Sequence, residues 1–278
     1  MVIIAMFSDD FLMEKLVLKG ASAMDFIYGI SQRSSMDVDF SMENRFSPDD
    51  LATVPEKIET ALNKIFGEKG FVVFDFKFSE VSSDRKMPFW GGYKVEFKII
   101  EKEKSDKLSG NRHKMRVQAK PIGKNKSTNC QVEISQYEFC THKRRGKMEN
   151  YTIFLYSPDM IVIEKLRAIC QQMTEYVHRS DRTKSARSKD FFDIYYLIEN
   201  FKVKLETAEN QELMKDIFAA KQAPLQLLGN LEKYREFHRQ DFFSLKDTVD
   251  QTVKVNEFDF YFDYVLGKVC ELKTLGII

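Results

Sequence analysis

Hydrophobic and polar residues in the first quarter of the chain follow two different periods. Apolar residues recur at helical spacing from about residue 23 to residue 30, directly after the small-residue turn Gly20-Ala21-Ser22. Residues 36–41 then alternate apolar and polar side chains with a period of two, which predicts a strand. Helical spacing returns over residues 51–66, after Ser47-Pro48, a pair typical of a helix start. The pattern therefore predicts helix, strand and helix in this order.

The rest of the chain divides into a strand-rich part and a helical part. Alternating or β-branched and aromatic segments predict strands at 71–78, 92–100, 113–119 and 129–134. Helical periodicity predicts helices at 160–176, 191–201, 212–220, 224–237 and 258–272. We place a domain boundary near residue 155, which gives an α/β domain at 1–155 and a helical domain at 156–278. The predicted fold class is α+β.

Composition is typical of a folded globular protein. The 278 residues are 43% hydrophobic and 31% charged, which is enough apolar material for a sizeable core. No apolar run is long enough to span a bilayer, and the amino-terminal residues lack the basic region of a signal peptide. The cysteines form no CxxC pair, so neither a zinc site nor a disulfide framework is indicated, and the histidines form no ligand cluster. We expect a cytoplasmic protein with reduced thiols and no membrane partner.

Charge is unevenly distributed along the chain. The segment from Lys102 to Lys147 holds thirteen Lys or Arg residues and four acidic residues, a charge of +9, against +1 for the whole chain. One interpretation is a pair of solvated hairpins with lysines on their edges. The other is a surface that contacts the phosphates of a polynucleotide. The sequence leaves both interpretations open.

Asp37 and Asp39 are the first candidates for chemistry. They are separated by one residue within the strand predicted at 36–41, so both carboxylates face the same side of the strand. Two carboxylates on a rigid strand suit Mg²⁺, which completes its coordination with water and substrate phosphates. Upstream, Gly20 and Ser22 lie in a turn that leads into a helix, where backbone N–H groups and the Ser22 hydroxyl can hold phosphates. Alone, each pattern also fits a structural role, as a charged strand and a helix cap.

Two blocks of residues, taken together, are more specific. The first reads Leu18-Lys19-Gly20-Ala21-Ser22-Ala23-Met24, followed by Arg33-x-Ser35-x-Asp37-x-Asp39-Phe40. The second reads Ser157-Pro158, Ile163-Glu164-Lys165-Leu166-Arg167-Ala168 and Arg187-x-Lys189-Asp190-Phe191-x-Asp193-Ile194-Tyr195. In this order they resemble the motifs of the AbiEii-like nucleotidyltransferases, the toxin family of type IV toxin-antitoxin systems within the DNA polymerase β-like superfamily. Ala21 stands where a second glycine is commoner, and the residues after Leu197 carry no family motif.

The resemblance implies a polymerase β-like domain with a mixed central sheet, followed by an all-helical domain that completes the active-site cleft. It also implies a third carboxylate from a later strand, for which Glu96 and Glu133 are candidates. We favour Glu133, because it lies on the last strand predicted before the helical half and because Val132 and Ile134 would bury the other face of that strand. Lys165 resembles the family's lysine that neutralises triphosphate charge, and Asp190 resembles its essential helical-domain aspartate. Asp193 we interpret as structural, paired with Lys189 or Arg187.

The mechanism implied is transfer of a nucleotide from an NTP to an acceptor hydroxyl, with release of pyrophosphate. Two Mg²⁺ ions, or Mn²⁺ in their place, would be bound by Asp37, Asp39 and Glu133. Gly20, Ser22, Arg33, Ser35 and Lys165 would bind the NTP, and Lys165 and Asp190 would join the catalytic set. The resemblance points to an RNA acceptor, particularly the tRNA 3′ end, and to a role as the toxin of a toxin-antitoxin or abortive-infection system with a cognate antitoxin. The RNA contacts predicted from charge are Arg33, Lys143, Arg144, Arg145, Lys184 and Arg187.

Two other functions fit the same residues. One is a small-molecule or protein nucleotidyltransferase, which would need a compact acceptor pocket rather than a broad basic face. The other is a non-catalytic module that binds nucleic acid or a protein partner on the same fold, in which Asp37 could be replaced without effect. Sequence alone does not identify the NTP that is used.

Overall fold

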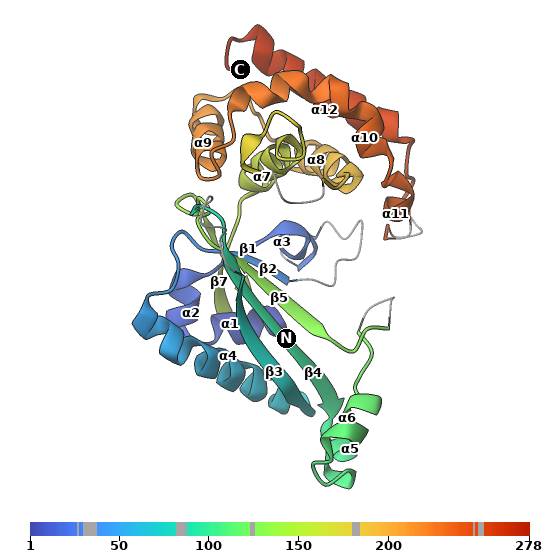
Figure 1. Ribbon diagram of the computed structural model, residues 1–278. Helices are drawn as coiled ribbons and strands as arrows, with labels where there is room; N and C mark the ends of the chain where they lie inside the picture. Colours follow the sequence, from blue (N-terminus) through green and yellow to red (C-terminus); the bar gives the residue numbers. More distant parts are fainter. Residues whose placement is uncertain are drawn as a thin grey trace. The chain divides into compact units, whose positions relative to one another are not determined.

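The computed structural model describes residues 1–26, 28–29, 38–81, 88–122, 126–179, 184–246, 248–249 and 253–278. The chain forms two compact units (Figure 1). Unit 1 comprises Met1–Ala23 with Ser35–Leu155, and unit 2 comprises Met24–Ser34 with Tyr156–Ile278. Each unit is described by itself below.

Unit 1 contains the sheet and its helices. Its elements are α1 (Val2–Phe7), α2 (Asp10–Lys15), β1 (Val17–Lys19), β2 (Val38–Ser41), α4 (Pro48–Glu68), β3 (Phe71–Val81), β4 (Gly92–Glu101), α5 (Lys102–Lys107), α6 (Arg112–Val117), β5 (Cys130–Ser135), β6 (Arg144–Met148) and β7 (Tyr151–Leu155). Helix α3 (Gly20–Phe26) follows β1 directly, and the division between the units falls within it, after Ala23.

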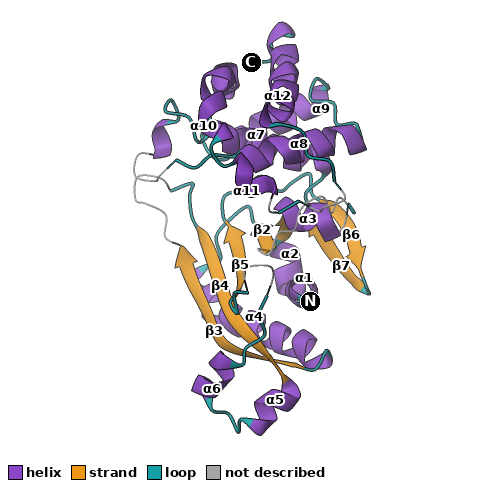
Figure 2. Cartoon of the chain, turned by 90° about the vertical axis from the view of Figure 1, so that its right-hand side faces the viewer, coloured by secondary structure: helices purple, strands orange, loops and turns teal. Residues whose placement is uncertain are grey.

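The seven strands form one mixed sheet in the order β3-β4-β5-β2-β1-β7-β6. Figure 2 shows β3, β4 and β5 side by side in this sheet. Strand β2 is parallel to β5 and antiparallel to β1, and β1 is parallel to β7. The remaining neighbours pair antiparallel. Strands β1 and β2 are therefore central, and they carry Leu18, Lys19, Asp39 and Phe40 of the first sequence block.

One face of this sheet is apolar and covered by helices. Phe40, Phe97 and Val132 are fully buried on it. The ring of Phe40 contacts Phe7 of α1 at a centroid distance of 5.7 Å, and Phe97 contacts Phe66 of α4 at 5.6 Å. Because side chains alternate along a strand, the residues between these point to the opposite face. That opposite face carries Asp39 and Glu133.

Helix α4 begins where the sequence predicts. Ser47 and Asp50 form a reciprocal capping box, with Pro48 in the first turn. The box satisfies two backbone donors at the helix start, and Pro48 has no N–H that would need a partner. The helix covers the apolar face with a stripe of buried side chains that includes Ile58, Leu62 and Phe66.

The strand predicted at residues 113–119 is wrong, because these residues lie mainly in helix α6. Asn111 caps that helix by accepting a hydrogen bond from Lys114 N. Met115 packs with Phe74 and Ile100, whereas Val117, which suggested a strand, is 76% exposed. The cap and a single buried side chain therefore outweigh a short run of alternation.

Unit 2 is built from helices. Its named elements are α7 (Pro158–Cys170), η1 (Val177–Arg179), α8 (Ser188–Phe201), α9 (Ala208–Ala219), η2 (Leu225–Tyr234), α10 (Arg235–Arg239), α11 (Phe242–Lys246) and α12 (Phe258–Thr274). Phe191 of α8 stacks on Phe262 of α12 at a centroid distance of 5.1 Å, and both side chains are fully buried. The predicted fold class, a mixed sheet followed by helices, is confirmed. In the described part of the chain no helix has the length and apolarity needed to cross a membrane.

Candidate active site

Asp39 and Glu133 are neighbours across two parallel strands. The register pairs Asp39 of β2 with Glu133 of β5, so both carboxylates lie on the polar face, on strands roughly 4.8 Å apart. Glu133 is exposed, and within the described residues its carboxylate has no hydrogen-bond or ion-pair partner. Asp37, Arg33 and Ser35 lie outside the described residues. Two of the three predicted metal ligands are thus brought together.

Gly20 lies against the same carboxylate. Its φ of +65° is in the left-handed region that favours glycine, and a Cβ added there would come within 3.0 Å of Asp39 Oδ2. Ser22, two residues further in the first turn of α3, is almost fully buried. The turn predicted to hold phosphates therefore begins beside Asp39, as the register Lys19↔Asp39 requires.

Lys19 adds a positive charge to this region that the sequence did not single out. Lys19 is 8% exposed, and its Nζ lies 3.6 Å from Oε1 of the buried Glu138. The backbone N–H of Glu138 donates to Met42 O, just beyond β2. The ion pair therefore ties the residue before Gly20 to the chain that follows β5.

Glu96, the other candidate for the third carboxylate, has a different environment. Its Oε1 lies 3.1 Å from Lys94 Nζ and 3.1 Å from Asn129 Nδ2. The hydrogen bond from Lys94, followed by that from Asn129, lowers the pKa of Glu96 below its ordinary value. Register places Glu96 opposite Gln131, one strand further from Asp39 than Glu133 is. The geometry therefore favours Glu133 as the partner of Asp39.

Of the two reasons for choosing Glu133, the burial of Val132 and Ile134 on the other face of the strand is confirmed, but the position of the strand is not. Strand β5 is not the last strand before the helical unit, because β6 and β7 follow it. These two strands, Arg144–Met148 and Tyr151–Leu155, were not predicted from the sequence.

The predicted residues of unit 2 form a buried charge cluster. Lys165 Nζ of α7 lies 2.9 Å from Asp190 Oδ1 and 2.7 Å from Asp193 Oδ2, both on α8. Arg187 donates from Nε to the other oxygen of Asp190. Asp193 therefore pairs with Lys165 rather than with Lys189 or Arg187. The spacing of three residues puts both aspartates on one face of α8, where they hold Lys165.

His238 completes the cluster on the side of Arg187. The backbone N–H of Arg187 donates to His238 Nδ1 at 3.2 Å, and the imidazole is fully buried. Burial lowers the pKa of His238 to about 4, so the ring is neutral at physiological pH. Attraction to Asp190 raises the pKa of Arg187 above its ordinary value. Within the cluster, the positive charges of Lys165 and Arg187 thus balance the negative charges of Asp190 and Asp193.

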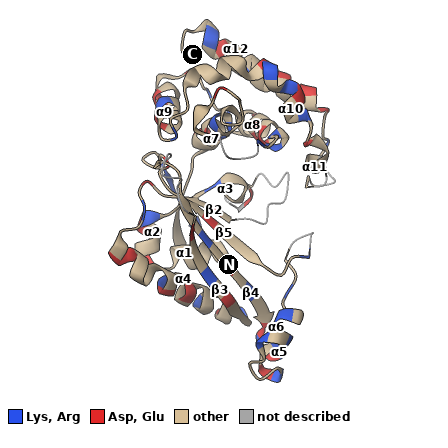
Figure 3. Ribbon diagram, viewed as in Figure 1, with Lys and Arg blue, Asp and Glu red and all other residues tan. Residues whose placement is uncertain are grey.

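The basic segment of the sequence is divided between two places in unit 1. Helices α5 and α6 lie beyond the ends of β3 and β4, where the ribbon in Figure 3 carries blue Lys and Arg positions. Strand β6, with Arg144, Arg145 and Lys147, forms the opposite edge of the sheet. The segment is therefore not one basic surface, and the interpretation as a pair of hairpins is also wrong, because part of it is helical.

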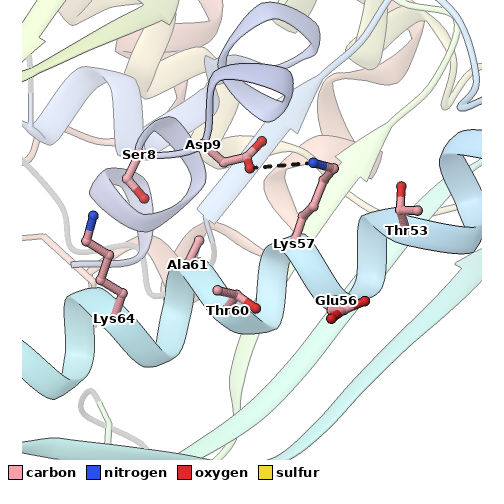
Figure 4. A pocket seen from close by; sticks show the side chains of 8 residues that line it. All are labelled: Ser8, Asp9, Thr53, Glu56, Lys57, Thr60, Ala61 and Lys64. Carbon is pink, nitrogen blue, oxygen red and sulfur yellow. Dashed lines mark ion pairs between the residues drawn. The ribbon is translucent and has the colours of Figure 1, made fainter.

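A groove of about 430 Å³ lies elsewhere in unit 1. It is lined by Ser8 and Asp9, beside the ion pair Asp9–Lys57, and by residues of α4 (Figure 4). None of the predicted site residues lines it.

Comparison with known proteins decides the family. The model of the nucleotidyl transferase AbiEii toxin family, from type IV toxin-antitoxin systems, matches residues 2–264. The chain belongs to this family. It is thus an AbiEii-family nucleotidyltransferase, and the match extends well beyond the two sequence blocks, into the first part of α12 at residue 264.

Other comparisons add little to this assignment. Among solved structures, an antigenic nucleotidyltransferase-like protein from Paracoccidioides brasiliensis is 15% identical, with a TM-score of 0.36 over 84% of this chain and 85% of that one. At that TM-score, the assignment rests on the family model alone. No curated protein gave a significant match.

Proposed function

We propose that this AbiEii-family nucleotidyltransferase transfers a nucleotide from an NTP to a hydroxyl of RNA, at the tRNA 3′ end, and acts as the toxin of its system. The observation that carries the proposal is the adjacent pair Asp39 and Glu133 beside the Gly20 turn. Phosphoryl chemistry needs acidic metal ligands and phosphate-binding backbone in one place, and unit 1 has both kinds of group on one sheet face. Arrest of growth through the modified RNA would account for toxicity.

The carboxylates fit Mg²⁺ as its ligands. Magnesium prefers oxygen donors, and it is usually held by one or two carboxylates together with substrate phosphates. Asp39 and Glu133 supply such donors in register, and we assign Asp37 to the same set from the sequence. In the described residues no group of three His, Cys, Asp or Glu side chains is close enough to hold a metal, and Asp37 lies outside them. When bound, Mg²⁺ would offset the charge on the reacting phosphate and favour deprotonation of the acceptor hydroxyl.

The remaining roles follow from where each residue lies. Gly20 and Ser22 offer the first turn of α3 to the β and γ phosphates, on the β1 side of Asp39. Lys19, paired with Glu138, places an ammonium group at that end. Glu133 lies on the opposite side of Asp39, and we assign it to the metal ion that activates the acceptor hydroxyl. A role for Lys165 and Asp190 toward the triphosphate stays a prediction from the family resemblance.

Label transfer from nucleotide to RNA tests the proposal. Wild type and Asp39→Asn are incubated with each α-labelled NTP, Mg²⁺ and total RNA, and the products are separated by size. We expect label in a discrete RNA band with the wild type and a loss of at least about 100-fold in Asp39→Asn, because a metal ligand has been removed. Asp49→Asn, an exposed aspartate at the start of α4, is the matched control and should keep wild-type activity. Label in protein instead of RNA would favour a protein nucleotidyltransferase, and equal labelling by Asp39→Asn would overturn the proposed site.

A further inference from the structure

The polar face of the sheet continues from Glu133 as a strip of charged and amide side chains. We define the polar strip as Lys77, Lys94, Glu96, Lys98, Asn129 and Gln131. Register pairs Lys94 with Glu133, Glu96 with Gln131 and Lys77 with Glu96, so these residues share the face of Asp39. The residues that alternate with them, such as Tyr93, Val95 and Phe97, are buried on the other face. The strip is therefore a partly exposed surface on a rigid, well-packed support.

Glu96 organises the part of the polar strip next to Glu133. It accepts hydrogen bonds from Lys94 Nζ at 3.1 Å, from Asn129 Nδ2 at 3.1 Å and from Gln131 Nε2 at 3.5 Å. Since the two amides donate to Glu96, their carbonyl oxygens remain as acceptors beside a fixed ammonium group. Donors and acceptors in fixed positions suit the polar edges of a nucleoside.

Positive charge extends along the polar strip away from the carboxylates. From Lys94 to Lys98 the strand β4 advances roughly 13 Å, at about 3.3 Å per residue. At the far end α6 packs over Phe74 and Ile100 on the same face, and Arg112 lies over the Phe74 ring at 5.9 Å. Arg116 of the same helix pairs with Asp75. A strand of nucleic acid laid along β4 would pass Lys94, whose ammonium pairs with Glu96, and would then meet the cations Lys98 and Arg112.

The order of groups across the sheet separates two sides of the site. Lys94 and Glu133 lie on one side of Asp39, and Lys19 with the Gly20 turn lies on the other. In the proposed function the Gly20 turn holds the phosphates of the donor NTP. The polar strip is then on the side that remains for the acceptor.

We propose that the polar strip binds the 3′-terminal segment of a polynucleotide acceptor, with its last nucleoside against Lys94 and Gln131 and its preceding phosphates along Lys77 and Lys98. This inference rests on the proposed function, because it assumes that Glu133 faces the acceptor hydroxyl. It places the acceptor on α6 and the β3–β4 side, and not on the basic edge strand β6. The occupant is a single strand, since bases must be unstacked to reach side chains on a flat sheet.

A matched pair of lysine variants tests the polar strip. Lys77 on β3 and Lys147 on β6 are both exposed, and each is replaced by glutamine. The KM for bulk tRNA and the KM for the NTP are measured between 50 and 200 mM salt. We expect Lys77→Gln to raise the acceptor KM and to reduce its log–log salt slope by about 0.7, the value for one phosphate contact on a single strand. The KM for the NTP and kcat should stay unchanged, and Lys147→Gln should behave as the wild type.

A second variant examines the nucleoside end of the polar strip. Gln131→Ala removes an amide without changing charge, so we expect a higher acceptor KM with an unchanged salt slope. Normal labelling of RNA with an unchanged acceptor KM in both Lys77→Gln and Gln131→Ala would contradict acceptor binding by the polar strip. It would leave the proposed function unaffected. An equal effect of Lys147→Gln would also overturn it, because the binding would then follow general charge. Label in protein rather than RNA would overturn both proposals.

Discussion

Gly20 is restricted by two separate properties of its position. The φ of +65° disfavours any side chain, and the space that a Cβ would need is taken by Asp39 Oδ2. The sequence predicts the turn, but it cannot predict the contact with Asp39, which depends on the antiparallel pairing of β1 and β2. Gly70, with a φ of +78° and nothing within 4 Å of the position that a Cβ would take, shares the first property and lacks the second.

Replacing each glycine by alanine distinguishes the effect of backbone strain from the effect of the contact with Asp39. We expect Gly20→Ala and Gly70→Ala each to lower the free energy of unfolding by about 1 to 2 kcal/mol, the cost of a left-handed residue. Only Gly20→Ala should displace the Asp39 carboxylate, and a displacement of that kind can reduce turnover on the order of 100-fold. Thermal unfolding and label transfer to RNA are the measurements. Equal loss of turnover in the two variants would contradict the role of Gly20 beside Asp39.

The candidate site could be predicted residue by residue only in part. The family motif identifies Asp39, and the alternation of apolar and polar residues around it predicts the face of the strand on which its carboxylate lies. Glu96 and Glu133 both alternate with buried residues in their strands, so periodicity alone leaves them equivalent. The parallel pairing of β2 with β5 distinguishes them, and strand pairing between distant segments is not encoded in local spacing.

At the scale of single elements, the long periodic segments were predicted as the correct type of element, as were the short strands β2 and β5, whereas α6 and β6 were not. Helices α4, α7, α8 and α12 follow from apolar stripes over several turns, although α7 ends at Cys170 and not near the predicted residue 176. Helix α6 was mistaken for a strand because six residues give no full helical repeat of apolar positions. Strand β6 reads Arg144-Arg145-Gly146-Lys147-Met148, and without apolar alternation it gives no strand signal at all. Its place at the edge of the sheet explains that composition.

The pairing between α7 and α8 was only partly predicted. The sequence indicates that Asp190 and Asp193 share a face of α8, but Lys165 lies on another helix. Buried charges persist where each has a partner, because leaving one uncompensated costs several kcal/mol. The cluster therefore fixes how α7 packs on α8, in addition to any role of Lys165 toward a phosphate.

His238 makes the stability of this cluster depend on pH. Three charged groups act on the imidazole: Asp190, Asp241 and Arg187. Its pKa is about 4 in the fold and about 6.5 when exposed, so the unfolded chain binds the extra proton between these values. Stability from His238 is therefore fully present above about pH 6.5 and is lost as the pH falls toward 4. The full loss would be on the order of 3 kcal/mol.

Thermal unfolding between pH 7 and pH 4 checks this expectation. We expect the melting temperature of His238→Gln to fall less steeply with decreasing pH than that of the wild type. His142→Gln, which removes an exposed histidine, should follow the wild-type curve. The buried, neutral state of His238 would be contradicted if the wild type and His238→Gln lost stability in parallel.

At the scale of the whole molecule, the net charge of a sequence segment did not predict where basic residues lie in the fold. The segment with a charge of +9 is continuous in sequence. In the fold, however, α5 and α6 lie at the far ends of β3 and β4, and β6 lies at the opposite edge of the sheet. Lys77, which we place on the acceptor side, lies outside that segment, and Lys94 and Lys98 also precede it. Fold class, in contrast, was predictable, since strand-like and helical periods occupy separate parts of the chain and the family match spans both.

The central claim is that nucleotide transfer takes place at the carboxylates on the polar face of unit 1, and turnover of Glu133→Gln tests it most directly. Glu80→Gln is the matched control, because Glu80 is an exposed carboxylate on β3 whose pairing with Tyr93 puts it on the other face. With saturating NTP, Mg²⁺ and RNA, we predict a loss in kcat of at least about 100-fold for Glu133→Gln and wild-type kcat for Glu80→Gln. Wild-type kcat in a folded Glu133→Gln variant would contradict the account.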